Sequence, residues 1–196
     1  MTHGTFSVAL LTGGQGRRLG GTDKSALVVG GRSILAALTA EARAVATEVF
    51  VVGALRGGHD GLRVVPDPVP GAGALAALVT ALEHSATDAT VVVAADMPFV
   101  QGAFLAWLAE RLDGHDAVVP RDAGGCHPLC AAYHRRAVTR LARAAASGVR
   151  RVQDAVAGLA VETASPEEYA AFDPTGRLLF NVNTPEDYHA ALDTDP

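Results

Sequence analysis

The residues best suited to chemistry lie in a glycine- and arginine-rich segment near the N-terminus. This segment reads Leu11-Thr12-Gly13-Gly14-Gln15-Gly16-Arg17-Arg18-Leu19-Gly20-Gly21-Thr22-Asp23-Lys24. Glycines lack a Cβ atom, so their backbone N–H groups can surround a phosphate group. Arg17, Arg18 and Lys24 add positive charge, and arginine can bind phosphate oxygens in a bidentate fashion. The segment directly follows an apolar run, which is where α/β folds bind ligands. It is therefore predicted to be a phosphate-binding loop.

The spacing of this loop excludes two familiar phosphate-binding motifs. A Walker A loop ends in Gly-Lys-Ser/Thr, whereas Lys24 follows Asp23. A dinucleotide fingerprint would need a glycine where Leu19 stands, and an acidic residue where the second predicted strand ends at Gly53. The loop is therefore a third kind of phosphate-binding loop.

A carboxylate follows the most apolar run of the chain. Asp96 comes directly after residues 90–95, a continuous apolar segment typical of a strand buried on both faces. A carboxylate fixed at the end of such a strand suits Mg²⁺, which prefers hard oxygen ligands. The alternative is that Asp96 caps a helix beginning near Val100.

Two asparagines near the C-terminus form a second candidate group. Asn181 and Asn183 are two positions apart, so on an extended segment their amides would face one way. They are suited to bind a ligand, or Asn183 to satisfy the first N–H groups of a helix that begins at Pro185. Asp67 lies in a proline-rich segment, where an Asp-Pro turn is an ordinary alternative to a binding role.

Cysteines and histidines lie close together in the second half of the chain. Cys126, His127, Cys130 and His134 fall within nine residues. Structural zinc sites usually pair C-x₂₋₄-C with a second, distant pair of ligands. Because these four residues also have to form a strand, the spacing favours two buried cysteines over a zinc site.

The elements that position these residues follow from the hydrophobic pattern. Apolar β-branched runs alternate with amphipathic, alanine-rich stretches, which is typical of βαβ units around a parallel sheet. The expected strands are 6–11, 48–52, 62–65, 90–95, 116–120, 128–133 and 159–163, and the expected helices are 33–46, 73–84, 103–112, 135–146 and 185–192. We expect an α/β fold of three α/β/α layers with a mostly parallel central sheet, in a single domain over residues 1–196.

Composition excludes several classes of partner. The net charge of −5 argues against nucleic acid, which requires a basic face, whereas the local charge at Arg17, Arg18 and Lys24 suits a small anion. Two cysteines make no disulfide framework, and no apolar stretch approaches the roughly 20 residues of a membrane span. We expect a cytoplasmic protein without a membrane partner.

The string LTGGQGRRLGGTDKSAL resembles the signature of the molybdenum cofactor guanylyltransferase family, within the wider class of Rossmann-like nucleotidyltransferases. The resemblance continues along nearly the whole chain, through Val65-Pro66-Asp67, Pro70-Gly71-Ala72-Gly73-Ala74-Leu75, Ala95-Asp96-Met97-Pro98-Phe99, His127-Pro128 and Asn181-Val182-Asn183-Thr184-Pro185. The chain departs from the family pattern at Thr12, Leu19 and Ala74, and at Gly53, where the family often has an asparagine that contacts guanine.

The resemblance implies a role for each matched residue. It implies catalytic roles for Arg18, Lys24 and Asp96, with Asp96 also binding Mg²⁺. The nucleotide-binding residues implied are Leu11, Thr12, Gly13, Gly14, Gly16, Arg17, Lys24, Gly53, Asp67, Gly73 and Asp96, and the pterin-binding residues are His127, Asn181 and Asn183. The N-terminal half would thus bind the nucleotide and the C-terminal half the pterin.

The implied reaction transfers GMP from GTP to the phosphate of molybdenum-bound molybdopterin, releasing pyrophosphate. Transient contacts with cofactor-supplying or recipient molybdoenzyme proteins would accompany it. The alternatives are a related nucleotidyltransferase that uses CTP or another phosphate acceptor, and a non-catalytic carrier of the cofactor. Lys24 and Asp96 argue against a carrier, which needs no grip on a triphosphate. Gly53 leaves only backbone groups for the base at that position.

Overall fold

The central sheet is the feature from which the arrangement of this protein follows. The computed structural model describes residues 4–12, 24–53, 61–66 and 73–193. In these ranges the sheet is built from β1 (Gly4–Leu11), β4 (Ala46–Val52), β5 (Arg63–Val65), β6 (Ala89–Ala94), β7 (Ala117–Asp122), β8 (Gly125–Cys126), β9 (Cys130–His134) and β10 (Val161–Ala164). A separate small hairpin pairs β2 (Val28–Val29) with β3 (Arg32–Ser33).

The order of the strands is β10-β7-β9-β6-β1-β4-β5, and β8 pairs with β7. Strands β6, β1, β4 and β5 are parallel neighbours. Strand β9 is antiparallel to both of its neighbours, β6 and β7, while β10 is parallel to β7. The prediction of a mostly parallel sheet is therefore confirmed, with β9 as an antiparallel member in its middle.

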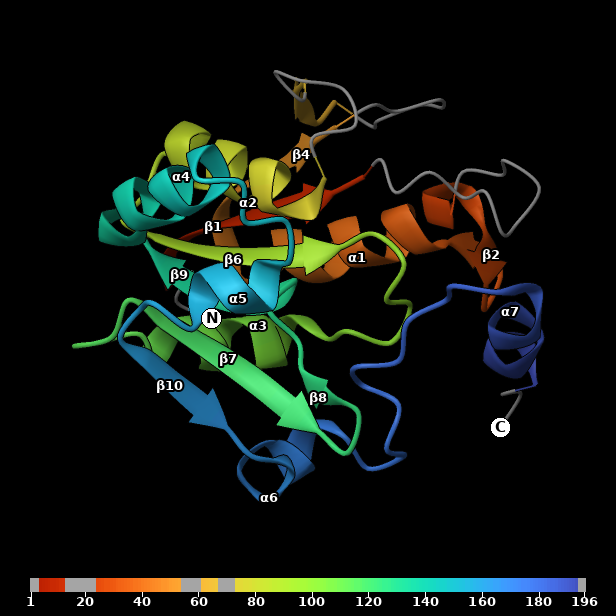
Figure 1. Ribbon diagram of the computed structural model, residues 1–196. Coiled ribbons are helices and arrows are strands. Elements are labelled where there is room, and N and C mark those ends of the chain that lie inside the picture. Colours follow the sequence, from red (N-terminus) through yellow and green to blue (C-terminus); the bar gives the residue numbers. More distant parts are fainter. Residues whose placement is uncertain (1–3, 13–23, 54–60, 67–72, 194–196) are drawn as a thin grey trace.

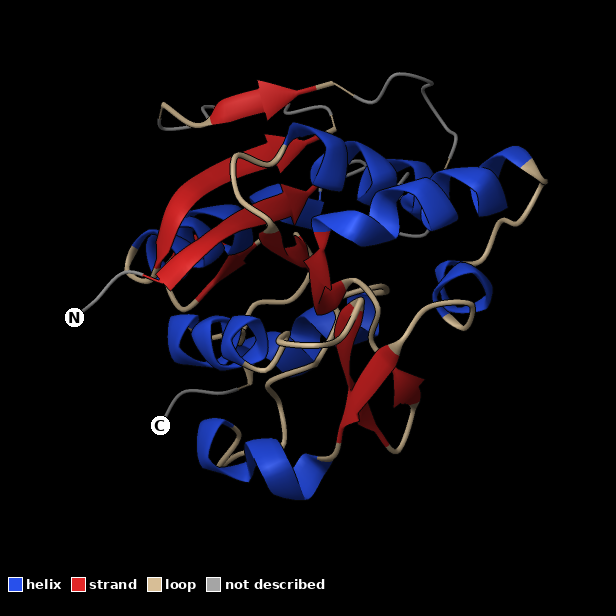
Figure 2. Cartoon of the chain, turned by 90° about the vertical axis from the view of Figure 1, so that its left-hand side faces the viewer, coloured by secondary structure: helices blue, strands red, loops and turns tan. Residues whose placement is uncertain are grey.

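Helices cover both faces of the sheet (Figures 1 and 2). One face packs against α1 (Ile34–Arg43) and α3 (Gly102–Glu110), and the other against α2 (Ala74–His84), α4 (Val138–Ala146) and α5 (Val152–Val156). The short helix α6 (Pro166–Tyr169) and the closing helix α7 (Pro185–Leu192) contribute to the first of these cores. The three-layer α/β/α architecture is as expected.

Alternation along the central strands divides the interior into two cores. In β1, Val8 and Leu10 belong to the core under α1 and α3, whereas Ala9 and Leu11 belong to the core under α2. Successive strand residues point to opposite faces, so a strand covered on both sides must be apolar throughout. This requirement explains the uninterrupted apolar run that ends before Asp96.

The chain reverses its direction of travel across the sheet beside β1. After β1 it continues to β4 and β5 on one side, and then crosses to β6 on the other side. The backbone stays paired just past the strand ends, where Ala95 N–H donates to the Leu11 carbonyl oxygen at 2.9 Å. In open α/β sheets such a switch point, at the carboxyl ends of the strands, is where ligands bind.

Among the described residues, no helix has the length and apolarity that crossing a membrane would need.

Candidate functional site

Three side chains from distant parts of the chain meet at this switch point. Lys24 begins a short 3₁₀ turn, Lys24–Ala26, Asp96 lies in the turn after β6, and Asn183 lies just before α7. The Lys24 Nζ donates to Asp96 Oδ2 at 3.2 Å and to Asn183 Oδ1 at 2.7 Å. The side chains of Lys24 and Asp96 are only 17% and 20% exposed. We call these three residues the lysine cluster.

The C-terminal segment is fastened to this cluster by its backbone. The N–H of Val182 donates to the Asp96 carbonyl oxygen at 2.8 Å, and the N–H groups of Asn183 and Thr184 each donate to Asp187 Oδ2 at 2.9 Å. Burial alone would raise the pKa of Asp187, but these N–H groups outweigh it and hold the pKa below its ordinary value. An ionised Asp187 therefore fixes the segment that presents Asn183 to Lys24.

Asp96 has an environment that suits a cation. Helix α3 begins after Gln101, so the interpretation of Asp96 as a helix cap is wrong. Its Oδ2 accepts from Lys24, whereas its Oδ1 is buried and has no hydrogen-bond partner among the described residues. Buried polar atoms are nearly always paired, so an orphaned carboxylate oxygen beside a ligand site fits a hard cation.

Asn183 does not cap the final helix either. That role belongs to Thr184, whose hydroxyl oxygen accepts from the Asp187 N–H at 3.1 Å, in a capping box completed by the Asp187 side chain. The two asparagines also contact different partners. Asn181 Nδ2 donates to the Leu179 carbonyl oxygen at 3.1 Å, while Asn183 contacts Lys24. The segment is not a strand, so the expectation that both amides face one way does not apply.

Gly53 lies against the start of the N-terminal loop. Its φ is +115°, and a Cβ atom placed there would lie 1.9 Å from the carbonyl oxygen of Thr12. Thr12 is itself held to the neighbouring strand, with its N–H donating to the Val52 carbonyl oxygen at 2.9 Å. The close approach of these two loops therefore requires glycine at position 53, and an asparagine would not fit this backbone. The Gly53 N–H is already bound to the Val65 carbonyl oxygen at 2.9 Å.

The other residues predicted for the nucleotide side are placed only in part. Leu11 ends β1 at the switch point, and Gly73 directly precedes α2. Six of the predicted residues lie outside the described ranges: Gly13, Gly14, Gly16, Arg17, Arg18 and Asp67.

Two of the predicted pterin-binding residues line one cavity of about 220 Å³. His127 and Asn181 share it with Met97, Cys126, Pro128, Leu129, Cys130, Val152 and Gln153. The third residue, Asn183, belongs to the lysine cluster. Sequence reasoning missed Asp122, whose Oδ2 lies 2.9 Å from His127 Nε2. The acidic residue five positions before the His-Pro pair was the available signal.

The cysteines and histidines of this region have separate environments. Cys130 is fully buried, which raises the pKa of its thiol to about 12, whereas Cys126 is exposed, so the expectation of two buried cysteines is wrong for Cys126. His134 accepts from the Arg136 N–H through Nδ1, at 3.1 Å. Among the described residues, no group of three or more side chains is arranged to hold a metal ion.

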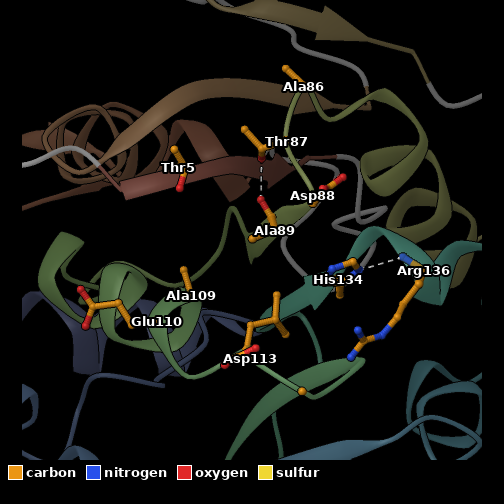
Figure 3. A pocket seen from close by; sticks show the side chains of 12 residues that line it. Thr5, Ala86, Thr87, Asp88, Ala89, Ala109, Glu110, Asp113, His134 and Arg136 are labelled. Atoms are coloured by element: carbon orange, nitrogen blue, oxygen red, sulfur yellow. Dashed lines mark hydrogen bonds between the residues drawn. The ribbon is translucent and has the colours of Figure 1, made fainter.

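A second, larger cavity of about 560 Å³ lies at the opposite end of the sheet (Figure 3). Its lining includes Thr5 and Ala89, near the amino ends of β1 and β6, so it is far from the carboxyl ends where Lys24 and Asp96 meet. Three carboxylates, Asp88, Glu110 and Asp113, line it. Because these charges would repel a triphosphate, this cavity is unsuited to a nucleotide.

The fold and the lysine cluster define a Rossmann-like α/β protein with charged and polar side chains gathered at the switch point of its sheet. Comparison with known proteins narrows this class. Residues 8–161 match the family model described as MobA-like NTP transferase domain. The chain therefore belongs to this family of nucleotidyltransferases.

Individual relatives extend the match over most of the chain. A probable molybdenum cofactor guanylyltransferase of Chloroflexus aggregans is 37% identical over 195 residues, covering 94% of this chain and 92% of the relative. Another, from Methanothermobacter thermautotrophicus, is 35% identical, with coverage of 92% and 96%. The crystal structure of molybdopterin-guanine dinucleotide biosynthesis protein A from Archaeoglobus fulgidus superimposes with a TM-score of 0.82 at 28% identity, covering 95% of this chain and 97% of that one.

Proposed function

We propose that this protein transfers GMP from GTP to the phosphate of molybdopterin, forming molybdopterin guanine dinucleotide and pyrophosphate. The observation that carries the proposal is the lysine cluster. It brings one cationic group, on Lys24, together with the side-chain oxygens of Asp96 and Asn183 at the switch point. The names of the relatives supply the substrates. The nucleotide side would be built largely by the N-terminal half and the pterin side by the C-terminal half.

In the reaction a phosphate oxygen of the acceptor attacks the α-phosphorus of GTP. A new P–O bond forms as the bond between the α-phosphorus and the bridging oxygen breaks, and pyrophosphate leaves with the electron pair. A phosphate is already a competent nucleophile at neutral pH, so this chain does not have to supply a strong base. Its contribution is to position the two substrates and to neutralise negative charge.

Lys24 is the residue best placed to neutralise that charge. An ammonium group has three N–H donors, and Asp96 and Asn183 account for two of them. The third remains for a phosphate oxygen, and the two acceptors fix the direction in which it points. Lys24 is also the only lysine of the 196-residue chain, in which arginine supplies all the other cationic side chains. Lysine carries its charge as a compact ammonium, unlike the planar guanidinium of arginine.

The residues of the cluster also suit Mg²⁺. Asp96 would hold it through the buried Oδ1, which has no partner among the described residues, and the metal would supply charge stabilisation at phosphate oxygens. The chain's own task is to hold Asp96 in the correct orientation, which Lys24 does at its carboxylate and the Val182 N–H at its backbone carbonyl oxygen.

The choice of base rests on groups other than a side chain at position 53. Since Gly53 is required by its contact with Thr12, and its N–H is occupied, selection of guanine falls to other parts of the nucleotide loops. The competing candidate is a cytidylyltransferase for the same acceptor. Measuring pyrophosphate release with GTP, CTP and ATP, each together with molybdopterin and Mg²⁺, separates the two candidates. We expect release with GTP and none with CTP or ATP.

The decisive variant is Lys24→Ala. We expect it to lower turnover by about 100-fold or more, because a charge that contacts the reacting phosphates is worth several kcal/mol. The fold should persist, since Lys24 lies at the edge of the sheet rather than in either core. The control is Arg143→Ala, which removes an exposed positive charge from α4. Full activity in Lys24→Ala would refute the mechanism.

A further inference from the structure

The 220 Å³ cavity adjoins the lysine cluster at two points. Met97, which lines the cavity, follows Asp96 directly, and Asn181 stands two residues before Asn183. A ligand held in the cavity can therefore extend a charged group towards Lys24. The cavity is smaller than the roughly 300–1,000 Å³ typical of sites that enclose a whole ligand, so it suits one ring system.

The lining of the cavity is that of a site for a neutral heterocycle. Met97, Leu129 and Val152 provide apolar surface, and the polar groups of His127, Gln153 and Asn181 are the directional contacts. None of the described residues that line it is a lysine, arginine or carboxylate. A phosphate would gain nothing here, whereas a flat ring with a polar edge would be bound on its faces and at that edge.

Asp122 determines how His127 presents its ring. Asp122 ends β7, and its Oδ1 accepts from the Gly124 N–H at 2.7 Å while its Oδ2 lies 2.9 Å from His127 Nε2. Burial would raise the pKa of Asp122, but the hydrogen bond from His127 and the N–H groups of the following turn hold it below its ordinary value. An ionised carboxylate only accepts hydrogen bonds, so Nε2 must carry the hydrogen.

The opposite nitrogen of the ring then has a defined character. With the hydrogen on Nε2, the Nδ1 of a neutral imidazole is an acceptor, and it has no partner among the described residues. Asn181 has the same character, because its Nδ2 donates to the Leu179 carbonyl oxygen and its Oδ1 remains to accept. The cavity thus offers two acceptors, whose complement is an edge that carries N–H donors.

We propose that Asp122 is a positioning residue that holds His127 in the Nε2–H form, so that Nδ1 accepts an N–H of the heterocyclic ring of the acceptor substrate. The identity of that ring as a pterin rests on the proposed function, whereas the form of His127 in the free protein does not. A pterin carries amide and amino N–H groups along one edge, which matches a pair of acceptors.

The first test reads the ring of His127 directly. Nitrogen-15 NMR of the free protein distinguishes the two neutral forms of histidine, and we expect the Nε2–H form. In Asp122→Asn the amide can donate to Nε2, so His127 should shift to the Nδ1–H form. Asp122→Ala offers neither donor nor acceptor and should give a mixture. The matched control, Asp113→Asn, changes an exposed aspartate that does not line this cavity and should leave His127 unchanged.

The second test measures the consequence for the acceptor. Asp122→Asn should raise the KM for molybdopterin about tenfold, which corresponds to one hydrogen bond lost, while the KM for GTP stays within twofold. The inference would be overturned if His127 of the unmodified protein were in the Nδ1–H form. It would also be overturned if Asp122→Asn shifted His127 to the Nδ1–H form without changing the KM for molybdopterin. If no nucleotide gives pyrophosphate release while the NMR result holds, the proposed function fails and the role of Asp122 towards His127 stands.

Discussion

At the scale of single residues, the contact between Gly53 and Thr12 is the tightest constraint near the site. A side chain at position 53 meets two costs, a positive φ and a Cβ atom 1.9 Å from a backbone oxygen that is itself fixed. We expect Gly53→Ala to lower the free energy of unfolding by more than about 3 kcal/mol, since both strain and a backbone clash contribute. Urea denaturation measures this directly.

A matched control separates the two costs. Gly114 has a φ of +79°, but a Cβ atom there would meet nothing within 4 Å. Gly114→Ala should therefore cost only the strain of a left-handed backbone, about 1–2 kcal/mol. If the two variants lose equal stability, the close approach of Thr12 does not constrain position 53, and an asparagine there would be tolerated.

The composition of the lysine cluster was foreseeable, but its contacts were not. Asp96 directly follows one predicted strand and Lys24 ends the loop that follows another, and the carboxyl ends of parallel strands share one edge of a sheet. That Asn183 binds Lys24, across 159 positions of sequence, depends on where α7 docks. Local pattern carries no information on such docking, and the assignment of Asn183 to the pterin came from the resemblance alone.

At the scale of elements, Asp116 joins three parts of the fold at the start of β7. Its carboxylate is buried and accepts from Arg136 Nε at 2.7 Å, Arg140 at 2.6 Å and the Ala160 N–H at 3.0 Å. The Ala160 N–H and the Arg136 guanidinium hold the pKa of Asp116 below its ordinary value. The carboxylate thus ties β7 to α4 and to the segment entering β10.

The lowered pKa gives this contact a defined pH dependence. A carboxyl group whose pKa is lower in the folded protein stabilises it fully above the unfolded value of about 3.9, and less as the pH falls through the folded value. We expect Asp116→Asn to cost about 2 kcal/mol at pH 7, limited by solvent around the exposed arginines. The difference in unfolding free energy from the unmodified protein should shrink below about pH 4.

Asp113→Asn is the control for this measurement, because Asp113 is exposed and lies only three residues earlier. Its effect should be small at every pH. A cost for Asp116→Asn that stays constant from pH 7 to pH 3 would show that packing, rather than charge, is what position 116 contributes.

The elements show which structure a local pattern can specify. Long periodic segments were predicted well, and α7 has the predicted bounds, because Thr184, Pro185 and Asp187 form its capping box in sequence. The hairpin of β2 and β3, the strand β8 and the short helices α5 and α6 were missed, since none of them has an apolar run or a period long enough to be distinguished from the sequence around it. The antiparallel direction of β9 was also missed, because alternation does not reveal direction.

At the scale of the whole molecule, the lysine cluster connects the N-terminal part of the chain with its C-terminal part, at one edge of the central sheet. Lys24 contacts Asn183, and nearby Tyr188 donates its hydroxyl to the Val28 carbonyl oxygen at 2.9 Å, which fastens α7 to the small hairpin. A ligand that binds the cluster therefore contacts segments that separate on unfolding. Binding should stabilise the whole fold, rather than one loop.

This stabilisation by a bound ligand can be measured through the fluorescence of a single tryptophan. Trp107 is the only tryptophan and stacks on Phe104 in the core under α3, with ring centroids 5.8 Å apart, so its fluorescence reports global unfolding. At a free GTP concentration 100 times Kd, with Mg²⁺, the stabilisation is about 2.7 kcal/mol. For a domain of this size the Tm should rise by roughly 5–10 °C.

Removal of the metal tests the role of Asp96 in the same experiment. Chelation of Mg²⁺ should remove most of the rise in Tm with GTP, because in the proposed mechanism the triphosphate and the metal share the cluster. Asp96→Asn should reduce it likewise, measured against the Tm of the same variant without ligand, because this variant also loses the ion pair between Asp96 and Lys24. Arg143→Ala changes helix α4, which covers the face of the sheet opposite to α7, and should retain the full rise in Tm with GTP. An undiminished rise in the presence of chelator would place the metal elsewhere than at Asp96.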